Sequence, residues 1–474
     1  MTIAADELCG LTAGALRDLL VTGAVSAREV AAAHLDWIER LDPAVNAMVT
    51  VTADLAMQTA GRLDEDLVHG GPVGPLHGLP FGFKDLTPDA GVRTTFGSLT
   101  HRDHVPRRHA LVAERVLAAG AVPLGKTNTP EFGVGPSTRN SVAGITRNPL
   151  NPELTAGGSS GGSAAALAAG MVALADGTDM AGSLRAPAVY CGVVGLRPTP
   201  GRVPGLPFRN GWFDLATPGP MARDVPSLAL NLSAMAGPDP RIPGVLPEAG
   251  SSFFPVGGLP RRPRVALAAP FGGLAFETEI VEAVLAQREV LVELGCQVQD
   301  AAPDFTDAGR IFRILRGWHM RSMLGSRIAA EWEAWDPLVR SSMVAAQQVT
   351  LDEVSWAIER RSTLFRRAGE FWRTVDFLVL PATQTQPFPA ADWYPSSLAD
   401  APVSDYLDAM GSSFFVSLLG APSLALPVAG DRRGMPIGVQ IVGRPGDDRG
   451  VLALAGAWEK ARGPLPVPPT AVAS

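Results

Sequence analysis

Lys84, Ser159 and Ser183 are the residues whose types and settings best suit proton transfer and nucleophilic attack. Lys84 ends the apolar run Leu79–Lys84, which we expect to form a buried strand. A lysine at that position is poorly solvated, and because burial disfavours the ammonium, its pKa can fall from about 10.4 toward neutrality. A neutral amine can accept a proton, so Lys84 is predicted to be a base. The alternative is an ammonium that reaches water at the strand end.

Both serines lie in segments rich in glycine. Ala156–Ser163 reads AGGSSGGS, and Asp176–Arg185 reads DGTDMAGSLR. Glycine at this density permits backbone conformations and close approaches that side chains would forbid. The first segment alone would also suit a linker, but helix-forming sequence follows it at once, and the second Gly-Ser turn comes 24 residues after Ser159. We therefore interpret both segments as turns of an active site.

A competing pattern, Gly120–Thr127, matches the phosphate-binding sequence GxxxxGK[ST] letter for letter. A loop of that kind must follow a strand and open a helix, because the helix N-terminus and the loop N–H groups hold the phosphates. Here the helical sequence Leu111–Ala119 precedes the pattern, and the strand-like residues lie inside it. We expect a helix, a turn and a strand ending at Lys126, and no ATP binding.

A second competing pattern, Gly157–Gly161, fits GxSxG, the nucleophile turn of α/β-hydrolases. That chemistry needs a histidine later in the chain, and His319 is the only one that follows. His319 lies in helical sequence, where a single histidine is more often an ordinary packed or surface residue than a base. We expect its replacement to have little effect on activity.

The elements around these residues indicate an α/β fold. A capping box at Ser26–Glu29 opens one of two expected N-terminal helices. From residue 72, short apolar runs bounded by glycine and proline alternate with helical stretches. Residues 198–220 are expected to form a long loop. Amphipathic helices are expected in residues 277–295 and 305–373, and strands at Phe377–Leu380 and Val439–Val442.

The composition excludes several classes of protein. Forty lysine and arginine residues against 47 aspartate and glutamate residues give a net charge of −7 without a basic run, so nucleic acid is not an expected partner. No apolar stretch is long enough to span a bilayer, and the acidic start lacks the features of a signal peptide, so we expect no membrane association and a cytoplasmic location. Cys9, Cys191 and Cys296 lack metal-ligand spacing, so neither a disulfide framework nor a metal site is expected, and no cofactor.

Nearly the whole chain carries segments typical of one family. They read GLPFGFKDL, GKTNTPEFG, RNPLNPELTAGGSSGGSAAALAAG, GTDMAGSLRAPAVYCGVVGLRPTPGRV, GPMARDV, DFLVLPAT and GAPSLALPVAGDRRGMPIGVQIVGRPGDD. In these segments the chain resembles the amidase signature family of serine hydrolases. The resemblance implies a single α/β domain with a central twisted mixed β-sheet, covered by helices on both faces, and a helical region in the second half.

The implied amidase signature domain covers residues 1–464. It divides into N-terminal helices in residues 1–70, a catalytic core in 72–225, a helical substrate-side region in 277–373 and a return to the core sheet in 374–464. Residues 465–474 are expected to form an extended tail.

The family's Ser–Ser–Lys triad falls on three residues of this chain. The resemblance makes Ser183 the nucleophile, Ser159 the bridging serine and Lys84 the base, with a cis peptide bond before Ser159. Neutral Lys84 would take the proton of Ser159, Ser159 would take that of Ser183, and the Ser183 oxygen would attack the carbonyl to form an acyl-enzyme. Water would then release the acyl group by the reverse route.

The resemblance also assigns the groups around the triad. The oxyanion would lie among the backbone N–H groups of Met180, Ala181, Gly182 and Ser183. Supporting side chains would be Ser160, Thr178, Asp179 and Arg185. The chain departs from the family pattern at Ala156, Ala181 and Ser417, where proline, glycine and asparagine are usual. We expect Ala181 to affect the oxyanion turn most.

The expected substrate-binding residues are mainly apolar. They are Phe208, Arg209, Trp212 and Phe213 of the loop 203–214 and Trp318 of the helical region, with Leu206, Met320 and Met323 as further candidates. Large apolar side chains on a loop near a site favour substrate cover, so this loop is predicted to close as a mobile lid. The alternative is a loop packed permanently on the helical layer.

We expect hydrolysis of C–N amide bonds in small to medium hydrophobic or aryl amides through an acyl-enzyme on Ser183. The alternatives are a carbamate (urethane) or ester hydrolase, a glutamine amidotransferase subunit, or a catalytically inactive binding subunit. Intact Lys84, Ser159 and Ser183 argue against the last. The expected partner is a small-molecule amide or carbamate substrate, and a homodimer is left open.

Overall fold

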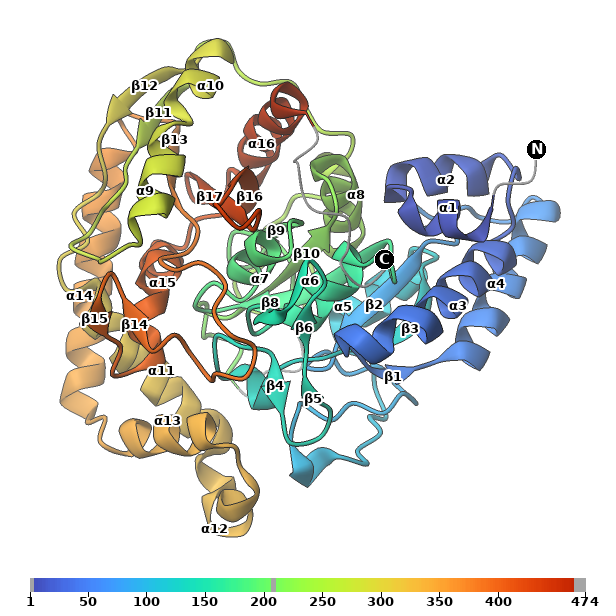
Figure 1. Cartoon of the computed structure of the whole chain (residues 1–474), viewed down its shortest axis with the longest axis horizontal. Coiled ribbons are helices and arrows are strands. Elements are labelled where there is room, and N and C mark those ends of the chain that lie inside the picture. The colour runs from blue at the N-terminus through green and yellow to red at the C-terminus, as the bar shows by residue number, and fades with distance from the viewer. Residues whose placement is uncertain (1–3, 206–209, 464–474) are drawn as a thin grey trace.

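Eleven strands form one mixed sheet in the computed structural model, which describes residues 4–205 and 210–463 (Figure 1). In their order across the sheet they are β1 (Met48–Val51), β3 (Val122–Thr127), β2 (Pro80–Lys84), β8 (Leu174–Asp179), β10 (Thr217–Ala222), β9 (Val194–Arg197), β16 (Ser423–Gly430), β17 (Pro436–Gly443), β13 (Phe377–Pro381), β11 (Arg264–Leu267) and β12 (Gln297–Asp300). Strand β2 is parallel to both β3 and β8, whereas β8, β10, β9, β16 and β17 run antiparallel to their neighbours in turn. The expected α/β domain with a mixed sheet is confirmed.

Helices flank this sheet (Figure 1). Helices α6 (Gly161–Ala168) and α7 (Arg185–Tyr190) pack against each other and on the central strands, and α8 (Val225–Met235) and α16 (Asp448–Arg462) form a second packed pair. At the N-terminal end lie α1 (Ala5–Gly10), α2 (Ala13–Val21), α3 (Ala27–Val45), α4 (Ala53–Val68) and α5 (Leu111–Ala118). Short strand pairs outside the main sheet are β4 (Arg139–Asn140) with β5 (Gly144–Ile145), β6 (Arg147–Asn148) with β7 (Asn151–Thr155), and β14 (Ser397–Leu398) with β15 (Ala401–Pro402).

The second half of the chain adds a helical layer at the far end of the sheet, on the left in Figure 1. It consists of α9 (Thr278–Leu285), α10 (Arg288–Glu293), α11 (Ala308–Leu324), α12 (Ile328–Glu331), α13 (Pro337–Gln347), α14 (Leu351–Phe371) and α15 (Gly411–Leu418). Helix α11 packs against α13, α14 and α15. These contacts hold α11 within the helical layer.

Several local expectations are confirmed. The Ser26 hydroxyl accepts from the Glu29 N–H at 3.1 Å, and the Glu29 carboxylate accepts from the Ser26 N–H at 2.8 Å, which completes the capping box of α3. The pattern Gly120–Thr127 forms a turn and β3 after α5, as expected. Lys126 is fully buried, and its ammonium donates to the Thr87 carbonyl oxygen, so it does not face a phosphate site.

One expectation is wrong in part. Residues 198–220 were expected to be loop, yet β10 begins at Thr217 and lies in the middle of the sheet. Its sequence TPGPMA has low strand propensity because of its prolines and glycine. All six residues are buried between β8 and β9, so pairing on both sides outweighs the local preference.

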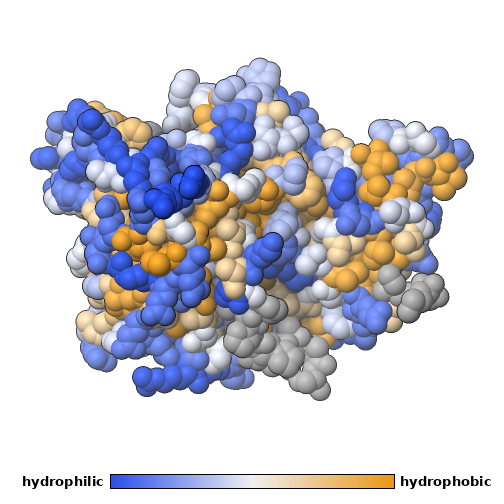
Figure 2. All heavy atoms as spheres, turned by 90° about the horizontal axis from the view of Figure 1, so that it is seen from above, coloured by the Kyte–Doolittle hydropathy of each residue, from blue (hydrophilic) through white to orange (hydrophobic). Residues whose placement is uncertain are grey.

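Apolar and charged side chains alternate in patches over the face seen in Figure 2. Among residues 4–205 and 210–463, no helix is both long and apolar enough to cross a bilayer.

Candidate active site

The carboxyl ends of β2 and β8 bring Lys84 close to the serines. These strands are parallel, so Lys84 and Asp179, the last residue of each, lie at the same edge of the sheet. The Lys84 Nζ atom lies within hydrogen-bond distance of three hydroxyl oxygens, those of Ser159 (2.7 Å), Ser160 (2.9 Å) and Thr178 (3.0 Å). A neutral amine has two N–H donors and one lone pair, so one of the three hydroxyls can donate to it while the other two accept.

The Lys84 side chain is completely buried, and this changes its acid–base chemistry. Burial lowers the pKa of its amine to about 7, although the carboxylates of Asp176 and Asp179 act in the opposite direction. Asp176 also accepts from the Lys84 backbone N–H at 2.6 Å, which fixes the end of β2. Near neutral pH a substantial fraction of Lys84 is therefore the free amine.

Ser159 and Ser183 line the same cavity, close to Lys84. The peptide bond between Gly158 and Ser159 is cis, as the sequence resemblance implied. The Ser183 carbonyl oxygen accepts from the Ser160 N–H at 3.2 Å, which ties the two turns together. Among the described residues no hydrogen bond joins the hydroxyls of Ser159 and Ser183 directly, and such contacts often tighten only when substrate is bound.

The turn from Met180 to Ser183 presents backbone N–H groups beside the Ser183 hydroxyl. Gly182 differs from the expectation for this turn, because its N–H donates to the Asp179 carboxylate at 3.0 Å. In the part of the chain that the structure describes, the N–H groups of Met180, Ala181 and Ser183 have no backbone partner. Among the described residues, the Gly182 N–H is thus the member of the expected donor set that a carboxylate already uses.

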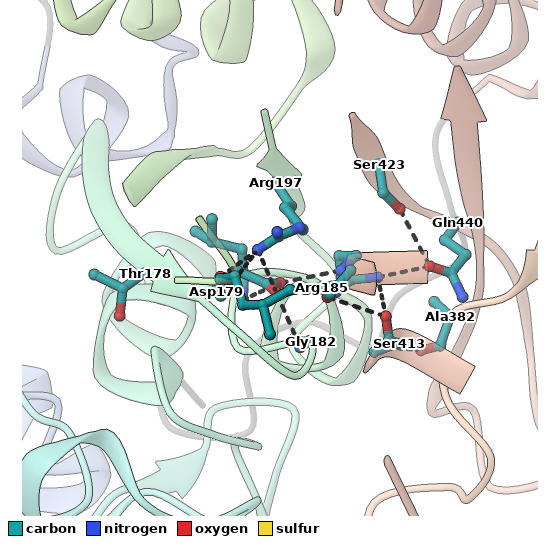
Figure 3. Close-up of polar contacts among 12 residues, drawn as sticks. Thr178, Asp179, Gly182, Arg185, Arg197, Ala382, Ser413, Ser423 and Gln440 are labelled. Carbon is teal, nitrogen blue, oxygen red and sulfur yellow. Dashed lines mark hydrogen bonds and ion pairs between the residues drawn. The ribbon is translucent and has the colours of Figure 1, made fainter. Parts of the chain in front are cut away.

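A buried ion-pair network holds this turn (Figure 3). Arg185 donates to both Asp179 carboxylate oxygens, at 3.0 and 2.9 Å, and neither side chain is exposed to solvent. Arg197 approaches the same carboxylate at 3.6 Å and donates to the Asp179 carbonyl oxygen. Burial alone would raise the pKa of Asp179, but Arg185 and Arg197 hold it at about 2. Asp179 and Arg185, which we expected to support the triad, therefore hold the turn that carries Ser183. Arg197 is a third member of this network, and the sequence analysis did not identify it.

The same arginine connects the turn to the second half of the chain (Figure 3). Arg185 Nη1 donates to the Ser413 carbonyl oxygen at 2.9 Å and to Gln440 Oε1 at 2.8 Å, and its Nη2 donates to Ser417 Oγ at 2.9 Å. Ser417 stands where the family usually has asparagine, and its hydroxyl still supplies an acceptor for the guanidinium. Helix α15 and β17 therefore help to fix the turn that carries Ser183.

Comparison with known proteins agrees with this geometry. The Amidase family model matches residues 29–452. An acylamidase of Rhodococcus erythropolis is 32% identical over 462 residues, covering 96% of each chain, and a glutamyl-tRNA(Gln) amidotransferase subunit of Heliobacterium modesticaldum is 33% identical over 478 residues, covering 95% of this chain and 97% of that one. The solved structure of a bacterial aryl acylamidase of the amidase signature family has a TM-score of 0.87 at 28% identity, covering 95% of this chain and 96% of the other.

The chain belongs to the amidase signature family. Membership makes it an amide hydrolase of the amidase signature type. It leaves the substrate class open, because the matched proteins include an acylamidase and an amidotransferase subunit.

The cavity of this amidase has a volume of about 240 Å³ above the two serines. Its walls are mostly apolar. The apolar lining includes Leu86, Pro88, Phe96, Phe132, Met320, Met323, Leu324, Leu407 and Met410, and the polar lining from outside the serine turns comes from Thr217, Arg316, His319 and Tyr406. Sequence analysis did not identify four of these residues. Phe96 and Phe132 have positive φ angles that no sequence pattern predicts. Tyr406 and Met410 lie in a segment without a recognisable motif.

Of the expected substrate-binding residues, Met320 and Met323 line this cavity and the two tryptophans do not. On α11, residues 316, 319, 320 and 323 share one face at helical spacing, whereas Trp318 points elsewhere and lies at the surface. Trp212 is 83% exposed. Phe213 is not part of the cavity wall but stacks on His319, with ring centroids 3.8 Å apart.

Three other expected residues, Leu206, Phe208 and Arg209, lie outside the described residues, and with them the central part of the predicted lid.

His319 lines the cavity, and within residues 4–205 and 210–463 no hydrogen bond joins it to Ser159 or Ser183. Burial lowers its pKa to about 4, and the charge of Arg316 acts in the same direction, so the imidazole is neutral near pH 7. Among the described residues its Nδ1 atom has no hydrogen-bond partner. Its position supports a role in shaping the cavity rather than in proton transfer.

Replacement of Asp179 by asparagine is expected to destabilise the amidase by about 3–5 kcal/mol, because two buried guanidinium groups would lose their counter-charge. The folded pKa of Asp179 lies below its ordinary value of 3.8, so this stabilisation is present above pH 3.8 and is lost as the pH falls toward 2. Denaturant unfolding of both proteins measures the difference.

The matched control is Asp300→Asn, which removes a carboxylate that is 78% exposed and pairs with Arg288. Its effect should be below about 1 kcal/mol. Equal stability losses in the two variants would contradict the bracing role of Asp179.

Proposed function

We propose that this amidase hydrolyses the C–N bond of small to medium hydrophobic or aryl amides through an acyl-enzyme on Ser183. The observation that carries the proposal is a buried amine, Lys84, with a pKa of about 7 and hydrogen-bonded to Ser159, beside Ser183 in an apolar cavity. An amine of this kind is rarely retained for stability, since its charged form is costly to bury.

In the proposed first step, the lone pair of the Lys84 amine accepts the Ser159 proton as Ser159 accepts that of Ser183. The Ser183 oxygen then attacks the substrate carbonyl carbon. Thr178 and Ser160 hold the amine in place through their hydroxyls. The developing oxyanion accepts hydrogen bonds from the N–H groups of Met180, Ala181 and Ser183, where each donor typically contributes about 10²- to 10³-fold in rate.

The proton then passes back to the leaving nitrogen as the C–N bond breaks, which releases the amine and leaves the acyl group on Ser183. Water donates a proton to the same path and attacks the acyl carbon. Release of the carboxylic acid restores the Ser183 hydroxyl and the free Lys84 amine.

The apolar walls support hydrophobic or aryl substrates over glutamine. Glutamine carries an ammonium, which a binding site would normally meet with a carboxylate. Within the described lining the only carboxylate belongs to Asp179, and it is paired with two arginines. Carbamates and esters stay as alternatives, because the same acyl transfer applies to them. A homodimer also stays a prediction, which sedimentation velocity would test.

A hydrolysis screen tests the proposal. The purified enzyme would be given anilides, primary aliphatic amides, carbamates, esters and glutamine at equal concentrations, with Ser183→Ala protein as the blank. We expect the highest kcat/KM among amides for anilides and no measurable release of ammonia from glutamine. Preferential turnover of glutamine would contradict the proposed substrate class, and no turnover of any compound would favour an inactive binding subunit.

A further inference from the structure

Arg316 is a cation in the wall of an otherwise apolar cavity. It lies on α11, is half-buried, and shares the cavity face of that helix with Met320 and Met323. Its Nη2 atom donates to Ser342 Oγ at 3.2 Å and to the Tyr406 hydroxyl, and the guanidinium carbon lies 5.5 Å from the centre of the Tyr406 ring. Both hydrogen-bond partners are uncharged.

Arg316 makes no ion pair with any described carboxylate, although Glu353 and Asp405 line a neighbouring cavity that Arg316 also lines. Within residues 4–205 and 210–463, no carboxylate oxygen lies within 4.0 Å of its nitrogens. Arg313, one turn earlier on the same helix, contrasts with it, because Arg313 pairs with both Asp405 and Asp408. The neutral His319 beside Arg316 supplies no counter-charge either.

The donors of Arg316 are also incompletely used. A guanidinium has five N–H groups in a planar fork, and the two hydrogen bonds of Arg316 involve one nitrogen atom. In the described part of the chain the N–H groups on Nε and Nη1 remain unused, and a charge-assisted hydrogen bond from them to a carboxylate is stronger next to apolar walls than in water. The local chemistry is therefore that of an anion-binding group that faces the substrate.

The position of Arg316 between two cavities limits the hydration free energy that an anion would lose on binding to it. Arg316, Tyr406 and Leu407 also line a second, more open cavity of about 430 Å³ on their other side. An anionic group bound at this boundary can keep part of its hydration, so it avoids the full penalty of burial. The serines stand on turns from the sheet, whereas Arg316 stands on α11, and both contribute to the wall of the same cavity.

We propose that Arg316 is a specificity-determining residue that binds a carboxylate, or a similar anionic group, at the end of the substrate remote from the scissile amide. The inference rests on the proposed function and specifies its substrate class further. The expected substrates are amides that combine an apolar or aryl part with one negative charge. The charge can be carried by the acyl part or by the amine part, and the experiment below distinguishes the two.

Two pairs of anilides of nearly equal shape serve as probes. Succinanilate and 4-oxopentananilide differ by a charge on the acyl side, and 4-acetamidobenzoate and 4-acetamidoacetophenone differ by a charge on the amine side. For the wild-type enzyme, the charged member of one pair should have a kcat/KM about 10- to 100-fold higher than its neutral analogue, the range expected for one charge-assisted hydrogen-bonded contact. The pair that shows the preference identifies the side that carries the anion.

Arg316→Met should abolish that preference, because it should lower kcat/KM for the charged substrate about 10- to 100-fold more than for the neutral analogue. Arg316→Lys should retain part of it, since lysine keeps the charge without the fork. The matched control, Arg321→Met, removes an exposed cation from the same helix and should leave the preference unchanged. A ratio near one in both pairs for the wild-type enzyme, or equal losses on charged and neutral substrates in Arg316→Met, would overturn the proposal.

Calorimetry separates this inference from the proposed function. In a Ser183→Ala background, the preferred charged anilide should bind, and the added Arg316→Met change should weaken its binding by about 10- to 100-fold without affecting the neutral analogue. That result would uphold the anion site even if no anilide were hydrolysed. Equal binding of the charged and neutral compounds would refute the anion site even if both were hydrolysed.

Discussion

Replacement of Ser183 by alanine is expected to lower kcat/KM for the preferred amide by about 10⁴- to 10⁶-fold, the range found when a catalytic nucleophile is removed. The change deletes one hydroxyl that lines the cavity, so it creates little empty space. The buried network of Asp179, Arg185 and Arg197 remains intact. Circular dichroism and the thermal unfolding midpoint should match those of the wild-type protein. Initial rates with the anilide selected by the screen measure the loss.

Ser160→Ala is the matched control for that experiment. It removes a neighbouring serine hydroxyl, which accepts one of the three hydrogen bonds at the Lys84 amine, but leaves Ser159 and Ser183 in place. The loss of one neutral hydrogen bond predicts only about a 3- to 10-fold decrease in kcat/KM. A folded Ser183→Ala enzyme with activity similar to that of Ser160→Ala would contradict the assignment of the nucleophile.

Replacement of Lys84 by methionine should lower kcat/KM by at least about 10³-fold. It should also abolish the pH dependence that arises from the ionisation of the lysine. Only the unprotonated amine can accept a proton, and burial lowers its pKa from 10.5 to about 7. For the wild-type enzyme, kcat/KM should therefore rise with pH below about 7 and level off above it. Methionine is similar in length and apolar, so it suits this fully buried position.

The pH profiles of the two proteins give the decisive comparison. Residual activity of Lys84→Met should lack the rising limb near pH 7. His319 provides the internal check, because its pKa is about 4 and His319→Ala should leave the limb unchanged. A Lys84→Met enzyme that keeps the same limb would show that another group is the base.

Lys84, Ser159 and Ser183 could be predicted from the sequence because each lies in a short local pattern that is typical of a buried base or of an active-site turn. Lys84 ends a wholly apolar run, and burial of β2 follows from that run. Ser159 and Ser183 stand in glycine-rich turns, one leading into α6 and the other between β8 and α7. Parallel pairing of β2 with β8 then brings the lysine to the serines, which agrees with the α/β alternation in the sequence.

The surroundings of these residues could not be predicted, since they depend on contacts between distant segments. Arg185 binds Gln440 and Ser417, which follow it by more than 200 positions, and the pairing has no local signature. The use of the Gly182 N–H by Asp179 depends on the exact path of one turn. The helical sequence of α11 predicts a helix, but which face meets the cavity is decided by its packing on α13, α14 and α15.

The central claim, an acyl-enzyme on Ser183 formed with Lys84 as base, is tested most directly by rapid acid quench during turnover of an activated anilide, followed by peptide mass mapping. The acyl mass should appear on Ser183 in the wild-type enzyme within the first turnover and should be absent from Ser183→Ala. Its rate of formation should rise with pH up to about 7, in step with the ionisation of Lys84. An acyl group found on Ser159 or Ser160 instead, or turnover without any covalent adduct, would contradict the account.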